Sequence, residues 1–291
     1  MADRGPVKLR EKDIAALIST YQSAYKDVVE TIVDATESGK IQKAKVLATI
    51  KVRLAELGED VDKWAKANIP QYYLDGANVA IQDIRELGVD VNKTSGLAVI
   101  NKQAIEALVS ETSDSLFASI TGVQRNASNI VNNAIRQQTN FIIADGKLKG
   151  EALKTISSGV QQTIKDGGLG ALTDKAGKRW SYEAYANMLV RTKSVEARNQ
   201  GLANRMLQNG YDLVQVTRHN SKHEACRKWE GKILSITGNT PGYPTLAEAT
   251  ASGIFHPNCK HAINVINPTL ATKTKAYDNP YNYEKAKKID K

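Results

Sequence analysis

All four histidines and both cysteines of the chain lie in one short stretch near its C-terminal end. Five of these six residues fit one metal-ligand pattern, in which two His-x2-Cys pairs are separated by 29 residues and a further histidine follows the second pair. A tight turn brings the two ligands of such a pair to the same side, where they can bind one tetrahedral ion. The pattern predicts one structural zinc ion, with the candidate ligands His223, Cys226, His256, Cys259 and His261.

Four ligands close a structural zinc site, so the five candidates leave the ligand set open. Cys226 and Cys259 rank first, because thiolates bind zinc most strongly and the chain has no other cysteine. His223 ranks next, as the partner of Cys226. His256 occupies the same place in the second pair, whereas His261 faces the same side as Cys259 if that segment is extended, so these two histidines compete.

Other interpretations of the cluster remain open. The cysteines can be a reduced buried pair or a disulfide, and His219 is expected at the surface because it precedes the predicted turn. A zinc nuclease would need a base such as Glu224 or Glu230, but no His-Asn-His or His-Glu-x-x-His pattern is present. A thiol nucleophile at Cys226 with His223 as its base lacks an identifiable orienting carboxylate.

The elements that position the cluster follow from hydrophobic periodicity. The fold class predicted is mainly α, with an N-terminal helical bundle or arm and a small α+β C-terminal domain. That domain contains one long helix and a short-stranded sheet that carries the His/Cys site at its turns. Gly58 is expected to stop a helix, Pro70 to bend or restart one, and Gly122 to mark a kink. The expected helices cover about 12–37, 41–57, 61–87, 97–143 and 181–208, and the expected strands cover about 213–216, 232–236 and 262–266.

Composition along the chain predicts four consecutive regions. A helical region covers residues 1–144, and a glycine-rich hinge with a short helix at about 153–164 covers residues 145–178. The site-bearing domain covers residues 179–268. A basic tail of residues 269–291 has no apolar period and is expected to be flexible.

The net charge of +9 is concentrated in the C-terminal part. Residues 1–177 carry 22 basic and 22 acidic residues, residues 178–268 carry 12 and 6, and residues 269–291 carry 6 and 3, so the excess is 0, +6 and +3. A basic face there favours double-stranded DNA without sequence preference, or it is a solvated surface. No run of 18 apolar residues and no apolar core after the basic N-terminus occur, so neither a membrane span nor a secretory signal is expected. The two cysteines then suit folding in a reducing cytoplasm.

Several motifs in the C-terminal part carry a resemblance to a known family. RTKSVEARNQGLANRMLQNGYDLVQV is followed by HEACRKWEGKILSITG and by GYPTLAEATASGIFHPNCKH. In this order and spacing they resemble the C-terminal domain of tailed-phage minor capsid proteins, the head-morphogenesis family that includes the Mu F-like proteins. The resemblance covers about residues 180–268. Relatives often have Cys-x2-Cys where this chain has His223-x2-Cys226, an exchange that keeps the site competent for zinc.

The resemblance implies a structural virion protein inside the capsid, made in the host cytoplasm during assembly. It would lie at or near the portal, contact the portal protein or the major capsid protein, and assist head assembly or DNA packaging and ejection. The resemblance implies no enzymatic activity. The alternative is a zinc-dependent, nuclease-like enzyme carried in the virion.

Overall fold

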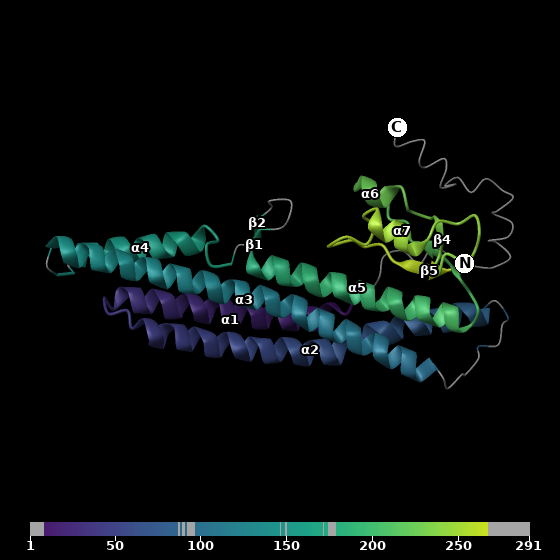
Figure 1. The fold of residues 1–291 in the computed structure, drawn as a ribbon, viewed down its shortest axis with the longest axis horizontal. Helices are drawn as coiled ribbons and strands as arrows, with labels where there is room; N and C mark the ends of the chain where they lie inside the picture. Colours follow the sequence, from purple (N-terminus) through teal and green to yellow (C-terminus); the bar gives the residue numbers. More distant parts are fainter. Residues whose placement is uncertain are drawn as a thin grey trace. The chain divides into compact units, whose positions relative to one another are not determined.

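The chain is mainly helical in the computed structural model, which describes residues 9–86, 88, 91, 97–145, 147–148, 150–170, 172–173 and 179–266. Five helices of 16 residues or more account for most of it (Figure 1). Within the described ranges, none of the helices combines the length and the apolar character that crossing a membrane requires. The five helices are α1 (Glu11–Glu37), α2 (Lys43–Glu86), α3 (Leu97–Asp145), α4 (Gly150–Lys165) and α5 (Tyr182–Gln208).

The short elements lie mostly after α5. A three-stranded antiparallel sheet has β3 at its centre, in the order β4-β3-β5. The short elements are β1 (Leu172–Thr173), β2 (Arg179–Trp180), β3 (Leu213–Val216), α6 (Glu224–Arg227), β4 (Ile233–Ser235), α7 (Leu246–Ala251) and β5 (Ile263–Val265). This arrangement confirms the predicted mainly α chain with a small sheet near the C-terminus.

The chain divides into two compact units that are not consecutive in sequence. The helical unit comprises Glu11–Ala65 and Glu111–Leu189. The sheet unit comprises Met1–Arg10, Lys66–Ser110 and Val190–Lys291. Helices α2, α3 and α5 therefore contribute residues to both units, whereas the sequence pattern predicted consecutive regions. The boundaries 1–144, 145–178 and 179–268 stay a prediction, and the predicted tail 269–291 lies outside the described residues.

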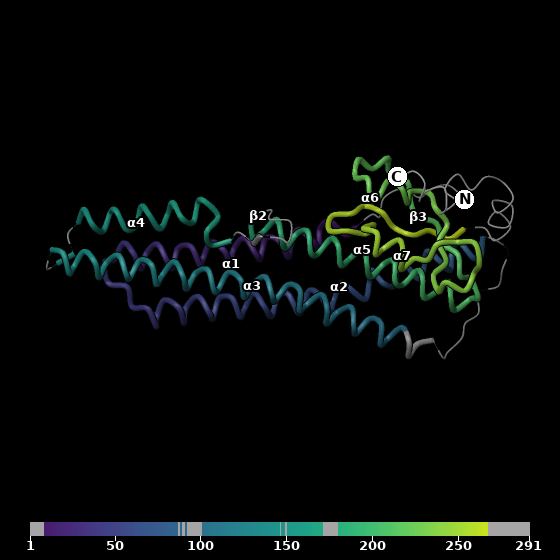
Figure 2. Tube along the Cα trace, turned by 45° about the horizontal axis from the view of Figure 1, so that its top comes forward, coloured from purple at the N-terminus to yellow at the C-terminus, as the bar shows by residue number. Residues whose placement is uncertain are grey.

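The helical unit is built from long helices that bury one apolar stripe each. Tyr21 of α1, Leu57 of α2 and Leu116 of α3 are fully buried in it. Figures 1 and 2 both show α4 alongside neighbouring helices, and α4 contacts α1. Ser157 and Gln161 of α4 donate hydrogen bonds to the Glu37 carboxylate, both at 3.2 Å. The short helix predicted in the glycine-rich segment is therefore present and packed.

The predicted break between the helices 41–57 and 61–87 and the predicted restart at Pro70 are wrong, because α2 is continuous from Lys43 to Glu86. Gly58 does not end the helix; it makes room for α3, since a Cβ on Gly58 would lie 2.8 Å from Cε1 of Phe117. Pro70 also lies inside the helix. The burial of Ile69 and Tyr73 on either side of it offsets the lost backbone hydrogen bond. Helix α3 likewise continues through the buried Gly122.

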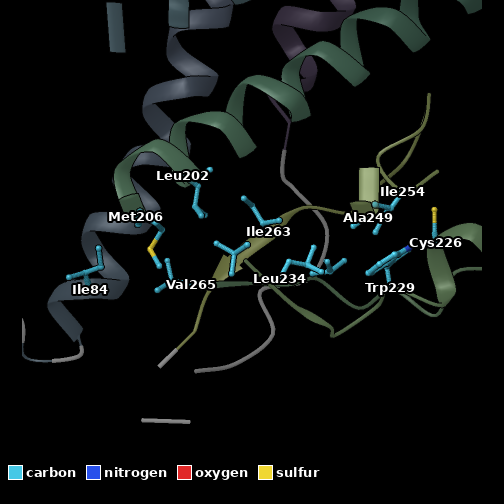
Figure 3. Close-up of a cluster of buried hydrophobic side chains, with 14 residues drawn as sticks. Ile84, Leu202, Met206, Cys226, Trp229, Leu234, Ala249, Ile254, Ile263 and Val265 are labelled. Atoms are coloured by element: carbon cyan, nitrogen blue, oxygen red, sulfur yellow. The ribbon is translucent and has the colours of Figure 1, made fainter. Parts of the chain in front are cut away.

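The larger apolar cluster of the sheet unit joins its sheet to its helices. Val214 of β3 pairs with Leu234 of β4 on one side and with Val265 of β5 on the other. These side chains and those of Leu202 in α5 form one buried cluster (Figure 3). The cluster extends to the cysteine region through Cys226, Trp229, Ala249 and Ile254, so the fold of the loops depends on the same core.

Helix α7 was not predicted, although its start carries a sequence signal. Thr245 caps the helix: its Oγ1 accepts a hydrogen bond from the Glu248 backbone N–H at 2.9 Å. Glu248 accepts in return from the Thr245 backbone N–H at 2.8 Å. The Thr-x-x-Glu spacing of this capping box is readable in the sequence. The helix matters for the site, because the second His-x2-Cys pair follows it directly.

Candidate metal centre

Both His-x2-Cys pairs form tight turns, each closed by a hydrogen bond from the cysteine N–H to the histidine carbonyl oxygen. The Cys226 backbone N–H donates to the His223 carbonyl oxygen at 3.1 Å, at the start of α6. The Cys259 backbone N–H donates to the His256 carbonyl oxygen at 2.8 Å, in the loop between α7 and β5. Each turn brings its histidine and cysteine to one side, as the spacing predicted.

The second turn needs two residues in the left-handed backbone region. Phe255 has φ of 60° and Asn258 has φ of 64°. Asparagine adopts this region readily, whereas a bulky phenylalanine does so at a cost of about 1–3 kcal/mol. Phe255 is half-buried against the core cluster, which helps hold it there. The loop is thus bent on both sides of His256, and the bend directs His256 and Cys259 toward the first turn.

Three of the predicted ligands form a compact inner group. The sulfurs of Cys226 and Cys259 are 3.7 Å apart, and Nδ1 of His261 lies 3.2 Å from the Cys259 sulfur. Cys226 and His261 are buried and Cys259 is half-buried. Both cysteines are free, and their separation is far longer than the S–S bond of about 2.05 Å, so the structure has no disulfide here.

The inner distances suit a tetrahedral ion. With Zn–S bonds of about 2.3 Å and Zn–N bonds of about 2.0 Å, two sulfur ligands lie about 3.8 Å apart and a sulfur and a nitrogen about 3.5 Å apart. The observed 3.7 Å between the sulfurs of Cys226 and Cys259 matches the first value. The 3.2 Å between the Cys259 sulfur and Nδ1 of His261 is shorter than the second value, so these two atoms would move slightly apart to bind one ion. The donor set of two thiolates and one imidazole fits zinc.

The two remaining candidates lie together at the outer side of Cys226. The rings of His223 and His256 have their centroids 4.3 Å apart. Ligand atoms of His223, Cys226 and His256 all lie within 4.8 Å of one another, as do those of the inner group. The structure thus brings all five predicted residues into two triads that share Cys226. Metal binding by these residues remains a prediction.

Sequence reasoning missed the partner of His261. Nε2 of His261 lies 2.8 Å from Oε1 of Glu230, and both side chains are buried. The same oxygen accepts the backbone N–H groups of His219, at 3.0 Å, and Ser221, at 2.9 Å. Glu230 is 31 residues from His261, so no spacing rule would have paired them. Glu230 is therefore a carboxylate that orients His261, a role that the sequence analysis did not assign to it.

His219 is not the plain surface residue that was expected. Its side chain is half-buried, its ring centroid is 4.7 Å from that of His261, and its Nε2 lies 2.8 Å from Oγ1 of Thr217. The reason is that β3 ends at Val216, directly beside β5, which starts two residues after His261. His219 thus belongs to the surroundings of the site.

Protonation in the site is set by burial and by close contacts. Burial, followed by the neighbouring Cys259, raises the pKa of Cys226 to about 12. Burial alone would raise the pKa of Cys259, but the contact with His261 outweighs it and lowers that pKa. Burial likewise opposes a charge on His261, yet contacts with Cys259 and Glu230 raise its pKa. For Glu230, burial is outweighed by hydrogen bonds from His261 and two backbone N–H groups, so its pKa is lowered.

Two cavities of the sheet unit reach the candidate ligands. One, of about 200 Å³, is lined by all five of them. The other, of about 330 Å³, lies between α5 and α7 and has His256, Cys259 and Phe255 in its wall. Asn258 at the rim donates its backbone N–H to Oγ1 of Thr192 in α5, at 3.3 Å. The two groups differ in burial instead: His223 is exposed and His256 half-buried, whereas Cys226 and His261 are buried.

The comparisons with known proteins give the class of the chain. Residues 71–291 match the family described as phage minor capsid protein 2. The match covers more than half of the chain, and it includes the site, helices α3, α4 and α5, and the end of α2. The chain belongs to this family of phage minor capsid proteins. The predicted family resemblance is confirmed and extends well before residue 180, where the sequence motifs began.

One curated relative is a phage protein as well. It is named "Structural protein" from Lactococcus phage LL-H and is 23% identical over 251 residues. The aligned part covers 78% of this chain and 67% of the relative. No solved structure matches the chain. The family description and the name of the relative both refer to components of phage particles.

Proposed function

We propose that this chain is a structural minor capsid protein of the virion head, located inside the capsid at or near the portal. The family match over residues 71–291 is the observation that carries the proposal. The relative named as a structural protein supports the same role. In this role the chain assists head assembly or the packaging and ejection of DNA, by contact with the portal protein or the major capsid protein.

We further propose that one structural zinc ion closes the two His-x2-Cys turns of the sheet unit. The three strands have only three or four residues each, and such short strands bury little surface. An ion that links α6, the loop after α7 and the residues before β5 would hold the loops to this sheet. Structural zinc contributes on the order of 10 kcal/mol to the folding of small domains.

The geometry gives less support to a zinc-dependent nuclease. Glu230 was one of two candidate bases, but its carboxylate oxygen already accepts three hydrogen bonds. Glu224, the other candidate, is exposed on α6 and has no interaction with the ligand set that would position it. The structural description of the family also favours a non-enzymatic role.

Purified heads provide the test of the proposed role. Quantitative mass spectrometry of full heads, empty heads and tails should find the chain in both kinds of head and not in tails. Cross-linking of intact heads through lysine should then join it to the portal protein or the major capsid protein. A chain that is absent from washed heads would contradict the proposed location in the virion. A chain that degrades DNA in a metal-dependent assay would favour the enzyme instead.

A truncation would not be a clean test of which part binds a partner. Removing residues 1–140 would delete Lys66–Ser110, which belongs to the sheet unit. Gly76 of that segment packs directly on α5, so the truncated chain would lose part of its core. Point substitutions in the full-length chain avoid this problem.

A further inference from the structure

We infer that the metal centre has two unequal halves: Cys226, Cys259 and His261 form a fixed inner half positioned by Glu230, and His223 and His256 share one exchangeable fourth position. The inference rests on the zinc site proposed above. It assigns three ligands and one shared position where the sequence left the ligand set open, and it gives Glu230 a function as a positioning residue.

The inner half is preorganised by its surroundings. Cys226 is 1% exposed and lies in the apolar core beside Trp229 (Figure 3). His261 is 2% exposed and lies two residues before β5. Neither side chain can turn away without opening the core, so the two ligand atoms keep their places whether or not an ion is bound.

Glu230 determines which nitrogen of His261 faces the sulfurs. A carboxylate only accepts hydrogen bonds, so Nε2 of His261 carries the proton in the 2.8 Å contact with Glu230. Nδ1, on the side of the Cys259 sulfur, is then the nitrogen whose lone pair can bind a metal. A carboxylate that holds the outer N–H of a metal-binding histidine is a common arrangement in zinc sites. The backbone N–H groups of His219 and Ser221 fix the carboxylate in turn.

The outer histidines lack this rigidity. His223 is exposed and His256 is half-buried, and they stack on each other rather than on the core. Each reaches Cys226 within 4.8 Å, but among the described residues no four ligand atoms all lie within that distance of one another. One histidine must therefore move inward to complete a tetrahedral shell, and both are close enough to do so.

His256 is the better placed of the two, and His223 is its substitute. Nδ1 of His256 lies 2.8 Å from the Pro257 carbonyl oxygen. This oxygen can only accept a hydrogen bond, so Nδ1 carries the hydrogen and Nε2 is left as the ligand atom. The 330 Å³ cavity in whose wall His256 lies leaves room for the ring to move, and for water when the ring is absent.

Cobalt(II) substitution in the full-length protein tests this division, because the visible spectrum reports the number and geometry of the ligands. Zinc affinity is measured alongside by competition with a chromophoric chelator. His223→Ala and His256→Ala should each keep an intense tetrahedral spectrum and lose less than about tenfold in zinc affinity, since the other histidine takes the position. The double variant should lose tetrahedral intensity and at least about a hundredfold in affinity.

The inner half should respond differently. His261→Ala or His261→Gln alone should lower the zinc affinity at least about a hundredfold. Glu230→Gln should lower it about 10- to 100-fold while the spectrum stays tetrahedral. Glu224→Gln, the same change at an exposed side chain of α6, is the matched control and should leave the zinc affinity unchanged. Circular dichroism of each metal-free variant separates loss of a ligand from loss of the fold.

Three outcomes would overturn the inference. His256→Ala could lose as much affinity as the double variant, His261→Ala could lose less than His256→Ala, or Glu230→Gln could leave the affinity unchanged. A wild-type chain that binds neither zinc nor cobalt would overturn the zinc site itself, and the inference with it. The first three results, by contrast, leave the zinc site standing.

Discussion

The backbone carbonyl of Arg198 lies where a side chain on Gly76 would begin. A Cβ on Gly76 of α2 would be 1.9 Å from the Arg198 oxygen in α5, and a Cβ on Gly201 of α5 would be 1.9 Å from the Tyr73 oxygen in α2. The two glycines thus allow the backbones of α2 and α5 to touch within the sheet unit. This contact ties the segment after Pro70 to the helix that covers the sheet.

Gly76→Ala and Gly201→Ala should each destabilise the sheet unit by about 3 kcal/mol or more, because the clash is with backbone that cannot rotate away. Gly159→Ala is the control: Gly159 lies inside α4 with no atom within 4 Å of its added Cβ. That change should stabilise by up to about 1 kcal/mol, since alanine favours a helix. Urea unfolding followed by tryptophan fluorescence measures all three. Equal stability of Gly76→Ala and Gly159→Ala would show that the helices are not in contact.

Asp212 should be a structural carboxylate whose effect depends on pH. It accepts hydrogen bonds from the Thr237 backbone N–H at 2.8 Å, from the Thr237 hydroxyl at 2.7 Å and from the Thr240 hydroxyl at 2.6 Å, and the Ser235 hydroxyl bonds to it as well. Burial would raise the pKa of Asp212, but these hydrogen bonds together lower it. Asp212→Asn should therefore cost about 1–2 kcal/mol at pH 7.

The lowered pKa of Asp212 determines how its contribution to stability changes with pH. Because the pKa of Asp212 is lower in the folded chain, its stabilisation is present above the unfolded pKa of about 3.9 and is lost as the pH falls through the lower folded value. The stability gap between wild type and Asp212→Asn should thus be constant from pH 7 to about 5 and shrink below about pH 4. Urea unfolding at several pH values measures the gap, with Asp114→Asn, a change of an exposed carboxylate in α3, as a control. A gap that widens in acid would contradict the assignment.

The proposed zinc ion can be tested by stoichiometry and stability. Elemental analysis should find about one zinc per wild-type chain and none in the Cys226→Ser, Cys259→Ser variant, because both inner thiolates are lost. Chelation should lower the melting temperature of the wild type but not that of the variant. Stoichiometric zinc in the double variant would show that the ion binds elsewhere.

The sequence predicted those parts of the fold that depend on neighbouring residues in the chain. The apolar period predicted helices at about 12–37 and 181–208, and the structure has α1 at Glu11–Glu37 and α5 at Tyr182–Gln208. A local signal also follows α5, since Gly210 has φ of 77°, which favours glycine. Gly58 was misleading, because its role is to accommodate Phe117 of another helix, and a contact between distant residues leaves no local trace.

The same distinction applies to the site. The His-x2-Cys turns are local, closed by hydrogen bonds over three residues, so their spacing predicted them. The division of the five candidates into an inner and an outer group is not local. It depends on Glu230, which reaches His261 only because β3 lies between β4 and β5 in the sheet.

The positive charge of the C-terminal part gives the last prediction, which concerns DNA. Lys222, Arg227 and Lys260 are all exposed, and each lies in or next to one of the His-x2-Cys turns. They are thus fixed to the candidate metal centre, in the region 178–268 that carries an excess of +6. Basic side chains held on one rigid element can neutralise DNA phosphates without reading the bases.

The chain should bind double-stranded DNA of any sequence, with an affinity that falls steeply with salt because counterions are released from the phosphates. Reversing Lys222, Arg227 and Lys260 to Glu should weaken binding and reduce the slope of log affinity against log salt by up to about 3, close to one per lost phosphate contact. Reversing Lys43, Lys45 and Lys51, which are exposed on α2 in the helical unit, makes the same change in net charge and is the matched control. Fluorescence anisotropy with two unrelated duplexes at several salt concentrations measures both sets. If the two triple variants lost affinity equally, net charge alone would explain the binding, and the turns of the sheet unit would not be the DNA-contacting surface.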